Sequence, residues 1–104
     1  VARFEGARRH APGEPRLLAA RALALARAGG DPVGLDEALR EWTDADPDDF
    51  LPLRMMGDLY VRRGEWDMAV RAYEGAMERT PPLDAWRDLE QALSDARARA
   101  GSLR

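Results

Sequence analysis

Side chains able to do acid–base or metal chemistry are few in this chain and stand apart in the sequence. His10 is the single histidine, and it lies in a turn two residues before Pro12. A lone turn histidine lacks the positioned partner group that metal binding and acid–base catalysis normally require. The chain has no cysteine, which excludes a thiolate zinc site and a cysteine nucleophile. We therefore assign His10 no chemical role.

Two loop segments carry residue types that are found in ion-binding and phosphate-binding loops. The acidic run over 44–49 is interrupted by Pro47 and lacks the central glycine and closing glutamate of an EF-hand loop. The glycine-rich stretch 29–34 has neither a preceding strand nor the following Lys-Ser/Thr pair of a phosphate-binding loop. Helix capping and turn formation explain both segments better. We expect no catalytic residue, no metal and no cofactor, and we predict that the chain is not an enzyme.

The composition restricts the class of protein. The chain has 104 residues, and its 16 basic residues, all arginine, against 19 acidic ones give a net charge of −3. Alanine and leucine dominate the apolar residues and isoleucine is absent, which favours helix over sheet. No apolar run approaches the roughly 18 residues that span a bilayer, and no segment reads as a signal peptide. We expect a soluble chain that inserts into no membrane. Because the first residue is Val1, we expect a processed chain or a piece of a longer one.

Arginine and acidic residues are interleaved along the whole sequence. This pattern leaves no basic face of the kind that nucleic acid requires. We therefore predict a partner other than nucleic acid.

A repeat of about 34 residues organises the sequence. Pro12, Pro47 and Pro81 are 35 and then 34 residues apart, and each is predicted to follow the end of a helix. The same spacing of apolar residues precedes each proline: Phe4-x-x-Ala7, Leu39-x-x-Trp42 and Tyr73-x-x-Ala76. Repeats of this length indicate stacked helix pairs.

The clearest unit runs from Phe50 to Pro81. It reads Leu53-x-x-Met56-Gly57-x-x-Tyr60, then Gly64, then Ala69-x-x-x-Tyr73-x-x-Ala76, then Pro81. This unit resembles the tetratricopeptide repeat (TPR), in which small residues let two antiparallel helices approach closely. Gly64 suits the left-handed position that ends the first helix. Asp48 or Asp49 is expected to cap the start of that helix.

The resemblance implies a single TPR domain over 1–104, an all-α right-handed superhelix of antiparallel helix pairs with about six helices. Its segments are 1–14 (second helix of a partial repeat), 15–49 (degenerate repeat), 50–83 (well-matched repeat) and 84–104 (capping helix and tail). In the degenerate repeat, Trp42 takes a position that is normally small. In the capping helix, Glu90 takes that position and prevents the close approach of another helix.

The aromatic residues could stack on bases or sugars, but they recur at helical spacing. That spacing is typical of packing between helices. We expect a core role for Trp42, Trp86, Tyr60 and Tyr73. Trp66, which comes just after Gly64, is the aromatic residue least fixed by packing between helices, and we expect it to be half exposed.

In TPR arrays the first helices of successive repeats line a concave groove, which implies a partner-binding surface here. By register its lining is Arg16, Ala19, Leu23, Ala26, Arg27, Leu51, Arg54, Asp58, Val61, Arg62, Arg87 and Gln91. We predict partner binding by the charged members: Arg16, Arg27, Arg54, Asp58, Arg62 and Arg87. This locally basic groove suits an acidic peptide. Alternatively, these arginines are ordinary solvated residues, since arginine is the only cation of the chain.

The resemblance implies a non-catalytic protein-interaction module that serves as a scaffold or adaptor in a bacterial assembly. Residues 42–74 are also similar to TPR proteins of exopolysaccharide export and cell-envelope assembly, which favours the periplasm or envelope over the cytoplasm. An alternative is a structural, oligomerisation or spacer element of a larger protein. A third possibility is that the repeats position the substrate of an enzyme domain outside this sequence.

Overall fold

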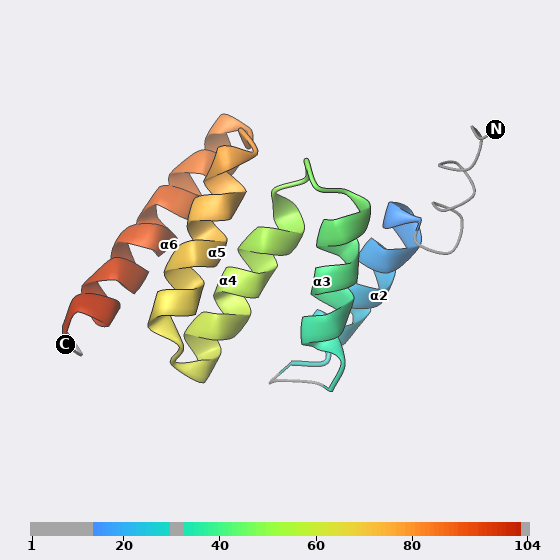
Figure 1. The fold of residues 1–104 in the computed structure, drawn as a ribbon, viewed down its shortest axis with the longest axis horizontal. Coiled ribbons are helices and arrows are strands. Elements are labelled where there is room, and N and C mark those ends of the chain that lie inside the picture. The colour runs from blue at the N-terminus through green and yellow to red at the C-terminus, as the bar shows by residue number, and fades with distance from the viewer. Residues whose placement is uncertain (1–13, 30–32, 103–104) are drawn as a thin grey trace. The chain divides into compact units, whose positions relative to one another are not determined.

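Every regular element of the described chain is an α-helix. The computed structural model describes residues 14–29 and 33–102. The helices are α2 (Pro15–Arg27), α3 (Leu35–Ala45), α4 (Leu51–Arg63), α5 (Trp66–Glu78) and α6 (Leu83–Ser102) (Figure 1). The all-α prediction is confirmed. These are five helices where about six were predicted, and the predicted helix over 1–14 falls almost entirely outside the described residues.

The chain forms two compact units, an N-terminal unit over 1–47 and a C-terminal unit over 48–104. In the N-terminal unit, α2 and α3 pack against each other. Trp42 is buried, as are Ala22 in α2 and Leu39 in α3. An ion pair between Arg21 and Glu41, 3.1 Å long, also joins the two helices.

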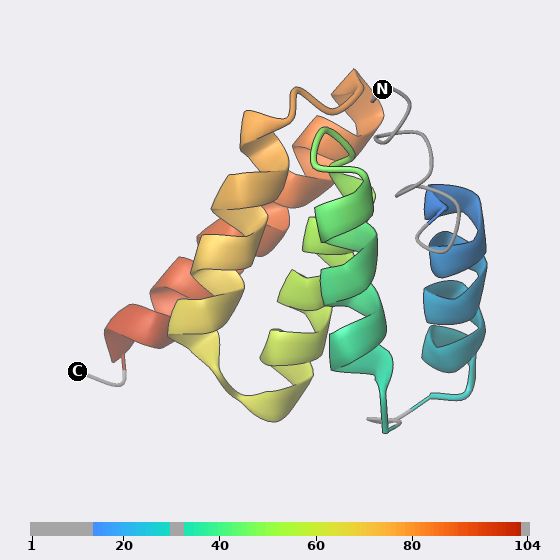
Figure 2. The ribbon, with the colours of Figure 1, turned by 45° about the vertical axis from the view of Figure 1, so that its right-hand side comes forward.

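A tight turn at Gly64 joins α4 and α5 in the C-terminal unit (Figure 2). Gly64 has φ +74°, a left-handed conformation that glycine adopts without steric cost. Its N–H donates to the carbonyl of Val61, and the next N–H, of Glu65, donates to the carbonyl of Tyr60. This pair of bonds is a Schellman motif, which satisfies carbonyls at the helix end. The predicted role of Gly64 is confirmed.

The start of α4 lies one residue later than the prediction that Asp48 or Asp49 is its N-cap. Phe50 is the N-cap residue, and it makes no side-chain capping bond. Instead, the Asp49 carboxylate accepts a hydrogen bond of 3.0 Å from the amide of Leu51. Asp49 thereby satisfies a free amide at the helix start, while Pro52 occupies the first turn, where its missing N–H costs nothing.

Close packing of α4 against α5 depends on Gly57. A Cβ atom built on Gly57 would lie only 2.8 Å from Cζ of Tyr73. The tyrosine ring can therefore pack against α4 here only because residue 57 has no side chain. Ala69 and Ala76 on α5 are fully buried, and Tyr73 is 2% exposed. The predicted close contact of small residues with a large ring is therefore present between these helices.

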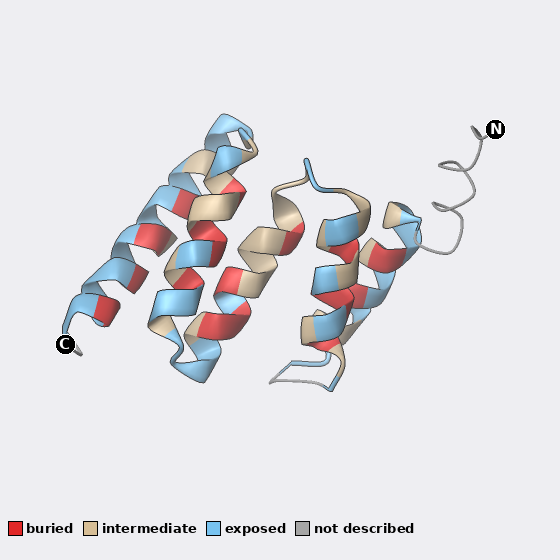
Figure 3. Cartoon of the chain, in the orientation of Figure 1, coloured by how far each residue is buried: buried red, intermediate tan, exposed pale blue. Residues whose placement is uncertain are grey.

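The helix α6 packs along α5 through one face. Its buried residues, Leu89, Leu93, Ala96 and Ala100, recur at helical spacing and form a stripe (Figure 3). Arg97 and Glu74 form an ion pair of 2.7 Å between the two helices. Glu90 is exposed, as expected of a capping helix. No helix in the described parts is both long and apolar enough to cross a bilayer.

Candidate functional site

Three consecutive helices of the C-terminal unit line a pocket of about 240 Å³. The helix α4 contributes one residue, α5 two and α6 four: Val61, Trp66, Tyr73, Ala92, Asp95, Ala96 and Arg99. Its walls are therefore mainly apolar and aromatic, with one carboxylate and one guanidinium. Apolar walls with a few polar groups are typical of binding sites.

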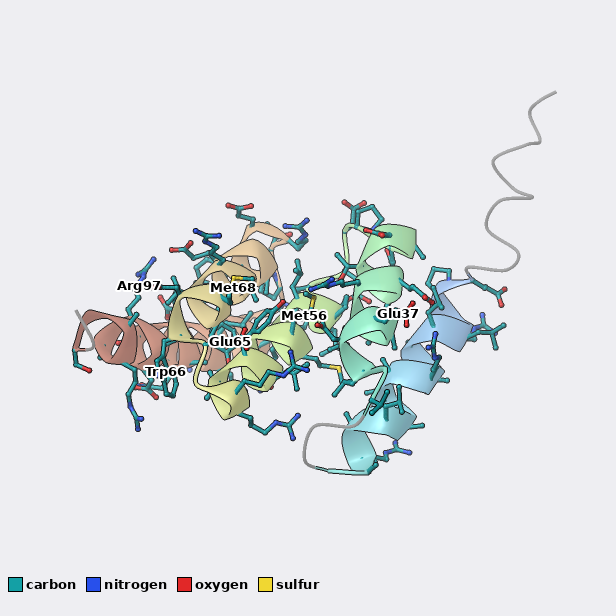
Figure 4. The ribbon with its side chains drawn as sticks, turned by 60° about the horizontal axis from the view of Figure 1, so that its bottom comes forward. Glu37, Met56, Glu65, Trp66, Met68 and Arg97 are labelled. Carbon is teal, nitrogen blue, oxygen red and sulfur yellow. The ribbon has the colours of Figure 1, made fainter. Side chains whose placement is uncertain are left out.

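A cation from the neighbouring helix lies over the ring of Trp66. Trp66 is the first residue of α5, and its side chain lies beside α6 (Figure 4). The guanidinium carbon of Arg99 lies 5.1 Å from the centroid of the Trp66 ring, within the range of a cation–π interaction. Trp66 is partly exposed, as predicted, although the sequence reasoning did not foresee Arg99 as its partner.

Asp95 places an anion one helical turn before Arg99. Its carboxylate accepts a hydrogen bond of 3.0 Å from the Gln91 side-chain amide. Among the described residues, Asp95 and Arg99 form no ion pair with each other or with any other side chain. The pocket wall therefore presents one hydrogen-bond acceptor and one set of donors, each with remaining bonding capacity.

Tyr73 connects the pocket to the exposed surface of α4. Its hydroxyl donates a hydrogen bond of 2.5 Å to the Asp58 carboxylate. Burial of the side chain raises the pKa of Tyr73 well above its ordinary value. The hydrogen bond to Asp58 and the charge of that carboxylate raise the pKa further, while the charge of Arg54 lowers it. Tyr73 therefore stays neutral at physiological pH and acts as a hydrogen-bond donor, which gives it no acid–base role there.

The predicted partner-binding residues lie in both units. Arg54, Asp58 and Arg62 lie on α4 at spacings of four residues, so they share one face of that helix. Arg62 is exposed and Arg54 is partly buried. The carboxylate of Asp58 is exposed but already accepts the tyrosine hydroxyl. Asp58 thus has a structural contact that the sequence reasoning did not assign to it.

The other predicted residues lie on separate helices. Arg87 is exposed on α6 of the C-terminal unit. Arg16 and Arg27 are exposed on α2 of the N-terminal unit. Their binding roles remain predictions.

The sequence reasoning missed the pocket residues on α6. Ala92, Asp95 and Arg99 recur at spacings of three and four residues, so they share one side of the helix beside the buried stripe. That spacing is the signal that could have found them. In the described residues, no cluster of three or more His, Cys, Asp or Glu side chains is arranged to hold a metal ion.

No protein-family model, curated protein or solved structure matches this chain. The case for a function therefore depends on the residues and geometry of the C-terminal unit.

Proposed function

We propose that this chain is a TPR-like helical-repeat protein that binds a segment of a partner protein and has no chemistry of its own. The partner segment lies on the pocket side of α4 and α6 in the C-terminal unit. We call this face the α4–α6 surface, and we define it by residues 54, 58, 61 and 62 of α4 and residues 91, 95 and 99 of α6.

The packing of α4, α5 and α6 supports the assignment to a repeat fold. Gly57 lies under the Tyr73 ring, and Gly64 ends the first helix of the pair with a Schellman motif. The next helix, α6, then packs on α5. A helix pair followed by a helix packed on its second member is the arrangement that stacked repeats use to bury their apolar faces.

The observation that carries the binding proposal is the pocket, because successive helices contribute to it together. Val61 comes from the first helix of the matched repeat, whereas Asp95 and Arg99 come from the following helix. A concave site between repeats suits an extended or helical peptide, since the repeats form the site before the ligand arrives.

The charges on this surface favour an acidic segment. Arg54 and Arg62 lie on α4, and Arg99 lies on α6. The surface also carries two carboxylates, Asp58 and Asp95, and that of Asp58 already accepts a hydrogen bond from the hydroxyl of Tyr73. Arginine binds carboxylates through charge-assisted and sometimes bidentate hydrogen bonds. A module of this kind acts as a scaffold or adaptor, and the resemblance given above suggests a bacterial assembly of the cell envelope or of polysaccharide export.

Charge reversal on α4 tests the proposal. Fluorescence polarisation with a labelled Glu-rich peptide that contains one aromatic residue measures the affinity of the wild type and of Arg62→Glu. We expect Arg62→Glu to weaken binding by roughly fivefold, the upper range for an exposed ion pair. The matched control is Arg71→Glu, because Arg71 is also exposed on a helix of the same unit but lies on α5.

Two results would count against a peptide-binding surface. The first is equal affinity of wild type, Arg62→Glu and Arg71→Glu for the peptide. The second is a light-scattering mass that rises with protein concentration and stays the same with added peptide, which would support the oligomerisation alternative.

A further inference from the structure

We propose that the pocket between α4, α5 and α6 takes one aromatic side chain of an acidic peptide, and that Asp95 and Arg99 bind the peptide main chain beside it. This inference rests on the proposed function and adds to it the chemistry of the anchoring residue.

The size of the pocket fits a single side chain. Its volume is about 240 Å³, whereas a cavity of roughly 150 Å³ holds a benzene molecule. Pockets for drug-sized ligands start at about 300 Å³. The pocket therefore has room for one aromatic ring and is smaller than the pockets that hold drug-sized ligands.

The lining favours an aromatic guest over a charged one. Val61 and Ala92 supply partly exposed apolar walls and Trp66 supplies a partly exposed ring, whereas Tyr73 and Ala96 are almost fully buried. Aromatic pairs gain from offset-stacked and edge-to-face contacts in addition to the burial of their area. A basic side chain would be attracted by Asp95 and the rings, but Arg99 already lies over the Trp66 ring and would repel it.

The polar groups match the main chain of an extended peptide. In an extended chain, the N–H and C=O of one residue point to the same side. The carboxylate of Asp95 can accept from that N–H, and the guanidinium of Arg99 can donate to that C=O. These two residues are four positions apart on α6, about one helical turn. Asp95 also disfavours an acidic residue inside the pocket, so the acidic residues of the ligand flank the ring and meet Arg54 and Arg62.

Three peptides of one design test the inference. Each is labelled and reads Glu-Glu-Ser-X-Ser-Glu-Glu, where X is Phe, Ala or Lys, and fluorescence polarisation measures the affinity of the whole chain for each. We expect the Phe peptide to bind about tenfold more tightly than the Ala peptide, from burial of the ring, and the Lys peptide to bind no more tightly than the Ala peptide.

A variant that fills the pocket shows where the ring binds. Ala92 is partly buried and lines the pocket, so Ala92→Phe should abolish the preference for the Phe peptide over the Ala peptide. The matched control is Ala98→Phe, because Ala98 is exposed on the same helix and does not line the pocket. That control should keep the tenfold preference, and circular dichroism should show native helix content in both variants.

Each contrary result has a distinct meaning. Equal affinity for the Phe and Ala peptides would overturn the pocket inference but leave peptide binding on the α4–α6 surface intact. Tightest binding of the Lys peptide, or a Phe preference that survives Ala92→Phe, would also overturn it. Failure of the wild type to bind any of the three would contradict the inference and the proposed function together.

Discussion

Replacing Gly57 with alanine measures how tightly α4 and α5 are packed. The added Cβ would lie 2.8 Å from Cζ of Tyr73, whereas carbon atoms pack at about 3.5–4.0 Å. The ring is 2% exposed and its hydroxyl is bonded to Asp58, so it cannot move aside without breaking other contacts. Overpacking of this kind costs about 1–3 kcal/mol. Alanine regains about 1 kcal/mol in helix propensity, so we expect a net loss of up to about 2 kcal/mol.

Gly75 offers the matched control on the facing helix. A Cβ atom there would meet Leu53 Cδ1 at 3.5 Å, an ordinary contact, so Gly75→Ala keeps the gain in helix propensity without a clash. We expect this variant to be more stable than the wild type by up to about 1 kcal/mol. Urea unfolding followed by circular dichroism gives the free energies of unfolding of all three proteins. If Gly57→Ala is as stable as Gly75→Ala, the close contact between α4 and the Tyr73 ring is refuted.

Further predictions concern Tyr73 and the α6 stripe. Tyr73→Phe removes the hydrogen bond to Asp58 and should lower the free energy of unfolding by about 1–2 kcal/mol in urea titrations at pH 7; an unchanged midpoint would contradict that bond. The pKa of Tyr73 is raised in the folded state above its ordinary value of 10.0, so its contribution is present below pH 10.0 and is lost as the pH rises further. The wild type should therefore lose stability more steeply than Tyr73→Phe above pH 10.0, and parallel curves would argue against the shift. Leu89→Ala should lower the free energy of unfolding by about 2–4 kcal/mol. The control Leu83→Ala, at a side chain 63% exposed, should change it by less than about 0.5 kcal/mol. Similar losses in both variants would contradict the packing of α6.

Much of the helical layout could be predicted from the sequence, because local chemistry determines helix ends. Pro52 and Gly64 mark the two ends of α4. In the structure Pro52 lies in the first turn of the helix, and Gly64 ends the helix in a left-handed conformation. Gly57 and Tyr73 could be matched through the repeat, since a small residue and a ring at fixed offsets face each other between paired helices. The predicted all-helical class is confirmed for the described residues.

The candidate site was harder to predict, because it depends on contacts between helices that are distant in sequence. Arg99 follows Trp66 by 33 residues, and no local pattern indicates that the two stack. Asp58 was predicted as a ligand-facing residue from its register, but register does not show that Tyr73 on the next helix donates to it. Sequence patterns identify the solvent-facing side of a helix, whereas the partner of each polar group there depends on tertiary packing.

A nuclear magnetic resonance titration of the whole chain with the Phe peptide tests the central claim most directly. Trp66 lines the pocket, whereas Trp42 lies in the N-terminal unit and Trp86 is not among the lining residues. We therefore predict that the Trp66 indole N–H signal shifts most among the three tryptophans, together with the backbone amides of Ala92 and Arg99. Unchanged signals for Trp66 and these amides, with shifts confined to other residues or absent, would contradict the account.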